Sequence, residues 1–172
     1  MTYTQFFTDS IAATLADALE QAGIGLPVYG QVSDPEAEHD RIEVRCNGTE
    51  EIIPGNYTTR LDCSVVLLVS ASANDAAEVE QLAATVAPVV NEVLHRPPAA
   101  AYGSGVPTSA GAYAVTGTSW KNVPLLDPRA EADAEYEKAP FIVLDLVAEP
   151  ANVETDGNSY AMQLDFRAYV QF

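Results

Sequence analysis

Two consecutive segments, residues 57–70 and residues 72–94, carry the clearest pattern of apolar and polar positions in the chain. From Leu61 to Val69 every second residue is apolar, which is the period of a β-strand with one face in a core. In the second segment apolar residues recur every three or four positions, which is helical spacing; they are Val79, Leu82, Val86, Val89, Val90, Val93 and Leu94. We therefore predict a long buried strand that leads into a long amphipathic helix.

The ends of this helix carry recognisable signals. Asn74 or Ser72 is suited to the N-cap, and His95 suits the negative C-terminal end. Pro97 and Pro98 stop the helix, whereas Pro88 lies inside it and is expected to kink its axis.

An earlier helix is predicted from about Thr4 or Asp9 to Gln21. Its apolar stripe consists of Phe7, Ile11, Leu15, Leu19 and Ala22, and polar residues occupy much of the remaining surface. Gly23 is placed to act as a left-handed C-cap. Residues 24–32 are then expected to form a loop that leads into a short strand, and residues 33–40 an exposed acidic loop.

Residues 41–46 alternate between polar and apolar positions and are followed by Asn47 and Gly48. Because Asn-Gly is the strongest short-range signal for a hairpin turn, we predict a turn there. Residues 49–53 would form a short return segment, and Pro54-Gly55 a second turn or an interruption before the long strand.

The remainder of the chain, residues 97–172, is predicted to contain two irregular stretches and three strands. Long irregular loops are expected at about residues 97–110 and 121–138, and strands at residues 111–120, 141–147 and 160–172, with a turn at residues 156–157. The strand at residues 141–147 is apolar on both faces except at Asp145, which is typical of a central strand. We predict a single α+β domain over residues 1–172, with a mainly antiparallel sheet and two helices packed on one of its faces.

The charge is strongly unbalanced, with 8 Lys and Arg against 25 Asp and Glu and a formal net charge of −17. Such a surface repels nucleic-acid phosphate and anionic lipid. Two interpretations stay open: the charge serves solubility, or a salt-rich habitat, or it allows one face to lie near DNA without binding it.

The sequence gives no sign of export or of a membrane span. No apolar run approaches the ~18 residues that a membrane helix needs, and the first ten residues lack the basic and apolar segments of a signal peptide. We therefore expect a protein that stays in a reducing cytosol, where Cys46 and Cys63 would be reduced core residues.

No catalytic, cofactor-binding or metal-binding residue is predicted, and we expect no enzyme. His39 and His95 share no motif, and the two cysteines lack zinc-ligand spacing. The acidic runs, Asp34, Glu36, Glu38 and Asp40, and Glu131, Asp133, Glu135 and Glu137, lack the order of a calcium loop. The glycines at residues 102–106 lack the strand, helix and lysine of a phosphate-binding loop.

The first half of the chain, from Gln5 to Leu94, resembles the tail terminator (tail-completion) proteins of long-tailed bacteriophages. The resemblance is one of pattern, without a diagnostic motif. It is carried by the opening helix at residues 6–19, by Gly25-Leu26-Pro27-Val28-Tyr29, by Ile53-Pro54-Gly55 before the long strand, and by the helix at residues 76–86. The remainder matches only in its strand content.

The resemblance implies a structural virion protein, assembled in the host cytoplasm and located in the tail-neck region. Such proteins form a homo-oligomeric ring, usually hexameric, that caps the tail tube and joins it to neck or connector proteins. DNA would pass through the ring without specific binding, and no cofactor or membrane is implied. Ring contacts would lie in the two long loops and on the exposed face of the last strand. Alternatives are another neck, connector or tail-tube subunit or, in a different class, a small ligand-binding domain or an unrecognised enzyme.

Overall fold

The computed structural model describes residues 3–30, 40–53, 58–69, 76–95, 123–126, 138–149, 151–153 and 160–171. These residues form helices α1 (Tyr3–Gln21) and α2 (Ala76–His95) and strands β1 (Val28–Tyr29), β2 (Arg41–Ile53), β3 (Thr58–Leu68), β4 (Val123–Leu126), β5 (Lys138–Ala148), β6 (Asn152–Val153) and β7 (Tyr160–Gln171). The predicted α+β class, with a mainly antiparallel sheet and two helices, is confirmed.

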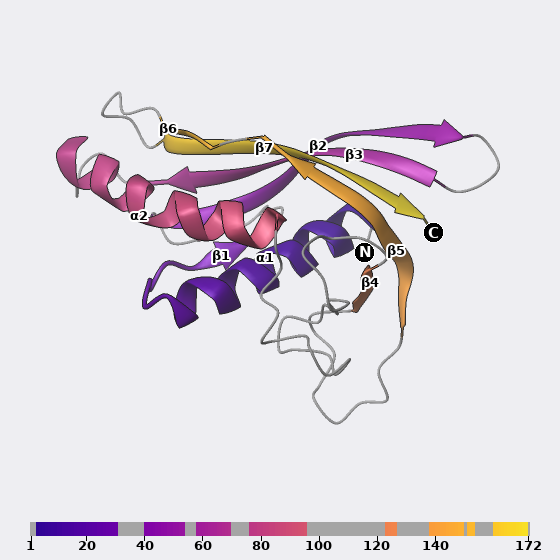
Figure 1. Ribbon diagram of the computed structural model, residues 1–172, viewed down its shortest axis with the longest axis horizontal. Helices are drawn as coiled ribbons and strands as arrows, with labels where there is room; N and C mark the ends of the chain where they lie inside the picture. The colour runs from indigo at the N-terminus through magenta and orange to yellow at the C-terminus, as the bar shows by residue number, and fades with distance from the viewer. Residues whose placement is uncertain are drawn as a thin grey trace.

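The strands form one sheet in the order β1-β2-β3-β7-β5-β4, with β6 paired to β7 beside β5 (Figure 1). Among the described strands only β1 and β2 run parallel, and every other neighbouring pair is antiparallel. The middle of the sheet is formed by β3 and β7. The strand β5, which the sequence places at the centre, instead lies between β7 and the edge strand β4.

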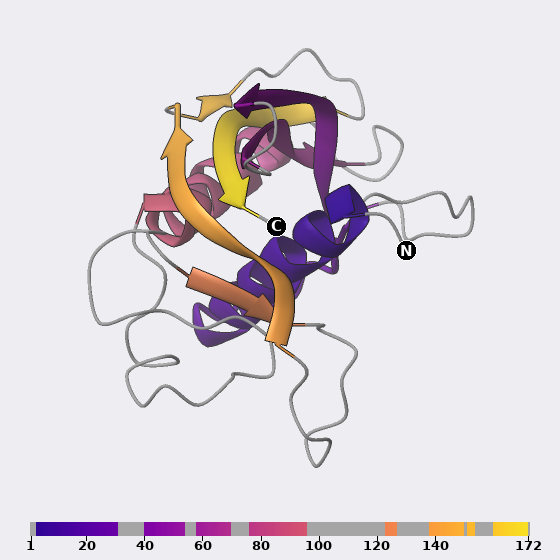
Figure 2. The ribbon, with the colours of Figure 1, turned by 90° about the vertical axis from the view of Figure 1, so that its right-hand side faces the viewer.

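Both helices pack on one face of the sheet, which curves around them (Figure 2). The register stacks the inward residues of neighbouring strands: Leu61, Cys63, Val65 and Leu67 of β3 face Ala168, Phe166, Leu164 and Met162 of β7. All eight are buried, as the alternating pattern predicted. Phe166 also meets Phe7 of α1, with ring centroids 6.3 Å apart, so the core joins the sheet to the first helix.

Helix α1 ends as predicted, on Gly23 with a φ of +75°. The Gly23 amide donates to the carbonyl of Glu20 and the Ile24 amide to that of Leu19, which is the Schellman pattern. The buried surface of α1 is wider than its apolar stripe, because Thr8, Ser10 and Thr14 are also fully buried. Thr14 satisfies its hydroxyl by donating to the Ser10 carbonyl at 2.9 Å.

Helix α2 buries five of the seven apolar residues that define its predicted stripe, while Leu82 and Val89 are half-buried. It continues through Pro88, which is exposed. At its C-terminal end His95 Nδ1 lies 2.8 Å from the Asn91 carbonyl, so the imidazole interacts with the last turn as expected.

The turn predicted at Asn47-Gly48 is wrong. β2 runs without reversal from Arg41 to Ile53, and residues 49–53 continue to pair with β3. Asn47 is the extra residue of a β-bulge, since Cys46 faces Cys63 while Gly48 faces Asp62. The Asn47 side chain donates to Ser64 Oγ at 3.1 Å across the strands, and Gly48 lacks the positive φ that the predicted turn type requires.

The last third contains one further difference. The stretch at 121–138 was expected to be irregular, but Val123–Leu126 forms β4, which pairs with β5, and Lys138 begins β5. Pro124 is compatible with β4 because that strand lies at an edge of the sheet. Other predictions lie outside the described residues: the acidic loop at 33–39, the N-cap at 72 or 74, the irregular stretch at 97–110, the strand at 111–120 and the turn at 156–157.

Candidate interaction surface

The face of the sheet opposite the helices carries four arginines of the described strands. Arg41 and Arg45 of β2, Arg60 of β3 and Arg167 of β7 alternate with the inward residues of their strands. The whole chain has only eight Lys and Arg. Each of these four arginines forms an ion pair on the uncovered face, and their partners are Glu43, Glu50, Asp62 and Glu149. Charge is therefore nearly balanced here, although the chain as a whole is strongly acidic.

Glu43 is held between two arginines of its own strand. Its carboxylate accepts from Arg41 Nε and from Arg45 Nε, each at 2.7 Å, and the Glu43 side chain is only 6% exposed. Burial acts to raise the pKa of Glu43, but the hydrogen bonds and charges of the two arginines outweigh it and lower the pKa. Because residues i and i+2 of a strand point to the same face, three consecutive outward positions of β2 form this cluster.

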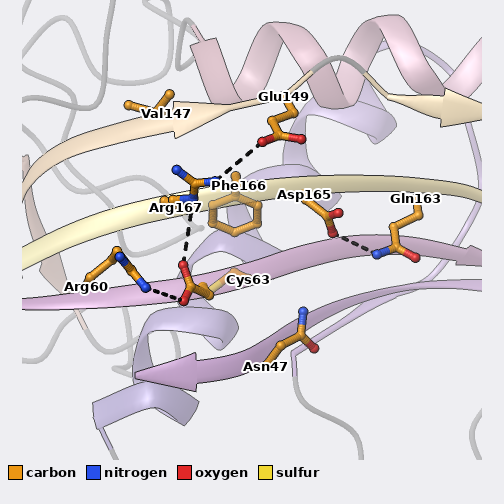
Figure 3. A pocket seen from close by; sticks show the side chains of 10 residues that line it. Asn47, Arg60, Cys63, Val147, Glu149, Gln163, Asp165, Phe166 and Arg167 are labelled. Atoms are coloured by element: carbon orange, nitrogen blue, oxygen red, sulfur yellow. Dashed lines mark hydrogen bonds and ion pairs between the residues drawn. The ribbon is translucent and has the colours of Figure 1, made fainter. Parts of the chain in front are cut away.

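A second group of charged side chains crosses three strands. Arg60 Nη2 lies 2.8 Å from Glu50 on β2 and 3.2 Å from Asp62 on its own strand. Arg167 on β7 lies 3.9 Å from Asp62 and 3.7 Å from Glu149, which follows β5 (Figure 3). These side chains are a third or more exposed, so solvent screens the pairs and each adds little to the stability of the fold. Their effect is to give the surface a fixed charge pattern.

This group borders an open hollow of about 600 Å³ over β3, β7 and the end of β5 (Figure 3). Its lining includes Arg60, Asp62, Val147, Asp165 and Arg167, with Val147 54% exposed. The lining contains no histidine, and its cationic groups are already paired with carboxylates.

The far ends of β2 and β3 extend beyond both helices (Figure 1). We name residues 49–53 and 58–60 the projecting hairpin. Thr49, Glu50 and Glu51 are exposed, and the apolar side chain of Ile52 is 42% exposed. In the same two strands, nearer the helices, the inward residues are buried. They are Ile42 and Val44 of β2 and Leu61, Cys63, Val65 and Leu67 of β3. The projecting hairpin thus lies outside the core that stabilises the domain.

Within the part of the chain that the structure describes, the outer edge of β2 is bare along the projecting hairpin. β1 pairs with β2 only at Ile42 and Glu43, and no described strand pairs with that edge from Val44 to Ile53. An unpaired edge is a template for a strand of another chain. The bulge at Asn47 and the charges of Glu50 and Glu51 limit indiscriminate pairing, so a partner would need a matching shape and charge.

Only some of the residues that the sequence analysis weighed as catalytic or metal-binding candidates lie within the described part of the chain. His95 ends α2, and Cys46 and Cys63 lie opposite each other on β2 and β3 as free thiols. His39, the run from Glu131 to Glu137 and the glycines at 102–106 lie outside the described residues. Sequence reasoning did not find the Glu43 cluster or the cysteine pair. The sequence did contain a signal for the Glu43 cluster, because Arg-x-Glu-x-Arg places three charges on one face of a strand. The opposition of the two cysteines depends on the register between β2 and β3, which the sequence does not show.

Within the part of the chain that the structure describes, no group of three or more His, Cys, Asp or Glu side chains could hold a metal ion. Neither α1 nor α2 is long and apolar enough to cross a membrane. Comparison with models of protein families and with curated proteins finds no match.

Proposed function

We propose that this chain is a tail terminator of a long-tailed bacteriophage, a structural subunit that assembles into a closed ring on the end of the tail tube. The ring would stop growth of the tube and offer a surface to neck or connector proteins. The observation that carries the proposal is the projecting hairpin with its bare β2 edge. Among the described residues no strand pairs with this edge, and a neighbouring copy could pair with it.

The contact that such a hairpin makes is of a kind that can close into a ring. When a hairpin on one side of a subunit binds a different surface of the next subunit, the contact is heterologous. A heterologous contact gives a ring if the rotation closes, and each bare edge is then covered by a neighbour. In this proposal the second surface includes the outward residues of β7, Gln163, Asp165, Arg167 and Gln171, which are exposed or half-buried.

The charge distribution is compatible with passage of DNA through the ring. The uncovered sheet face pairs its four arginines with carboxylates, so none of them is left as an unpaired cation for phosphate. The chain as a whole carries a formal net charge of −17, which would repel DNA. A ring with these properties would let DNA cross without holding it.

Negative-stain electron microscopy of the purified chain, alone and with tail tubes, tests the proposal. We expect closed rings of uniform diameter, which in the mixture sit on tube ends. Open tubes formed by the chain itself would support a tail-tube subunit instead. A chain that stays monomeric at high concentration and does not bind tubes would contradict assembly altogether and would favour a ligand-binding domain that uses the hollow.

A further inference from the structure

The two cysteines of the chain face each other at the base of the projecting hairpin. Cys46 on β2 and Cys63 on β3 are register partners, and they are the last inward pair before the bulge at Asn47. Cys63 is 2% exposed, whereas Cys46 is half-buried at the margin of the core. Both are free thiols, and Cys46 Sγ lies 3.4 Å from the carbonyl oxygen of Gly48.

The positions of the two residues suit a bond between their sulfurs. Directly opposed residues of an antiparallel pair have Cα atoms about 4.5–5.5 Å apart, and a disulfide requires about 4.4–6.8 Å. Their Cβ atoms lie about 4.5–5.5 Å apart in an ordinary pair, against about 3.5–4.5 Å in a disulfide, so a small approach is needed. The extra residue of the bulge, directly after Cys46, can absorb this shift in the backbone.

The two thiols also differ in acidity in the way that disulfide formation requires. A hydrogen bond with the Cys63 thiol lowers the pKa of Cys46 to about 7, against the opposing effects of burial and of Asp62. The same hydrogen bond, together with burial, raises the pKa of Cys63. Cys46 is therefore the more acidic thiol and the readier nucleophile, and Cys63 holds its proton more strongly.

We propose that Cys46 and Cys63 form an oxidation site at which a peroxide produces a reversible cross-strand disulfide. The Cys46 thiolate attacks one peroxide oxygen, an S–O bond forms, the O–O bond breaks, and the leaving hydroxide takes up a proton to become water. The Cys63 sulfur then attacks the sulfenic sulfur. The S–S bond forms, the S–O bond breaks, and the departing hydroxide takes the Cys63 proton to give a second water. Two thiols are oxidised for each peroxide reduced.

The bond would link β2 to β3 one inward residue of β3, the buried Leu61, before the projecting hairpin. Neither described helix covers the projecting hairpin, so the cross-link would add a covalent restraint to the register that the paired strands β2 and β3 set there. The inference does not rest on the proposed ring, because it concerns only contacts within one chain.

The test is treatment of the full-length native chain with hydrogen peroxide, followed by alkylation of free thiols and peptide mapping by mass spectrometry. We expect both thiols of the wild type to disappear together, with a Cys46–Cys63 linked peptide and a loss of two hydrogen atoms from the intact chain. Dithiothreitol should restore both thiols. The oxidised chain should unfold at a temperature about 5–10 °C higher than the reduced chain.

Two single variants are the matched controls. Cys63→Ala should leave Cys46 to be oxidised to a sulfenic or sulfinic acid, and Cys46→Ala should leave Cys63 unreacted, because it is buried and protonated. The proposal is overturned if wild-type Cys46 is oxidised while Cys63 remains a free thiol, or if the only disulfides join separate chains. It is also overturned if both thiols persist at a peroxide concentration that oxidises the urea-unfolded chain. These readouts need no variant to fold.

Discussion

Strands β2 and β3 pair with each other along their whole described length, yet their two halves have different surroundings. On one side of the bulge at Asn47, the inward residues pack under α1 and α2, and Ile42, Val44, Val65 and Leu67 are fully buried. On the other side, the projecting hairpin extends beyond both helices, and Ile52 is 42% exposed (Figure 1). The two strands are therefore hydrogen-bonded to each other throughout, but only one half of the pair packs against the helices.

The difference indicates what each half contributes. Burial of apolar side chains against the helices stabilises the first half, at about 25 cal/mol per Å² of apolar surface removed from water. The second half gains little from such burial within one chain, and its ion pairs are partly exposed. A segment of this kind adds little to the stability of the monomer. Contact with another subunit would give the projecting hairpin a role.

The largest expected effect of a substitution is in the covered half. Leu67 is 0% exposed and lies between Ile42 of β2 and Met162 of β7. Leu67→Ala removes this packing and leaves a cavity, so we expect the free energy of unfolding to fall by about 2–5 kcal/mol. Denaturant unfolding at one fixed protein concentration measures the change. A loss below 1 kcal/mol would show that this half is not the stabilising core.

A smaller effect is expected at the Glu43 cluster on the uncovered face. Glu43→Gln removes the carboxylate that Arg41 and Arg45 share, and we expect a loss of about 1–3 kcal/mol in the free energy of unfolding at pH 7.

The same substitution has a pH signature. The pKa of Glu43 is lower in the folded chain than its ordinary value of 4.5. Its contribution is therefore fully present above that ordinary value and is lost as the pH falls through the lower, folded-state pKa. The wild type and Glu43→Gln should thus converge in stability below pH 4.5. If the two plots of unfolding free energy against pH stayed parallel below pH 4.5, the two arginines would not stabilise the ionised Glu43 carboxylate in the folded chain.

The smallest expected effect is in the projecting hairpin. Ile52→Ala removes apolar atoms that are already partly in water, so the free energy of unfolding of the monomer should change by about 0.5 kcal/mol or less. The measurement is the same denaturant unfolding, made under conditions in which the chain is monomeric. A loss as large as that of Leu67→Ala would remove the distinction between the two halves.

Most of the fold could be predicted from the sequence wherever one residue pattern decides the outcome. The alternation from Leu61 to Val69, the helical spacing of α2 and the alternation of β7 all gave the correct element and the correct buried face. Gly23 was correctly predicted to cap α1. These features depend only on residues that are close in sequence. Such residues set the spacing of apolar positions along a strand or helix and the glycine that ends a helix.

The errors arose where partners distant in sequence decide the structure. Asn47-Gly48 is a strong local turn signal, but β3 offers pairing partners on both sides of it, and the chain continues as a bulged strand. The opposition of Cys46 and Cys63 depends on register, which a one-residue slip would have changed. Val123–Leu126 became a strand because β5 was available to pair with it. The bare β2 edge likewise becomes apparent only once the strand order is known.

The most direct test of the account is the oligomeric state of three proteins at equal concentration, measured by size-exclusion chromatography with multi-angle light scattering. Ile52→Lys places a charge in the projecting hairpin, and Ala84→Lys places the same charge on the exposed surface of α2. We predict that the wild type and Ala84→Lys form the same closed oligomer, whereas Ile52→Lys remains a folded monomer. A strictly monomeric wild type, or an Ile52→Lys protein that assembles as the wild type does, would contradict the account.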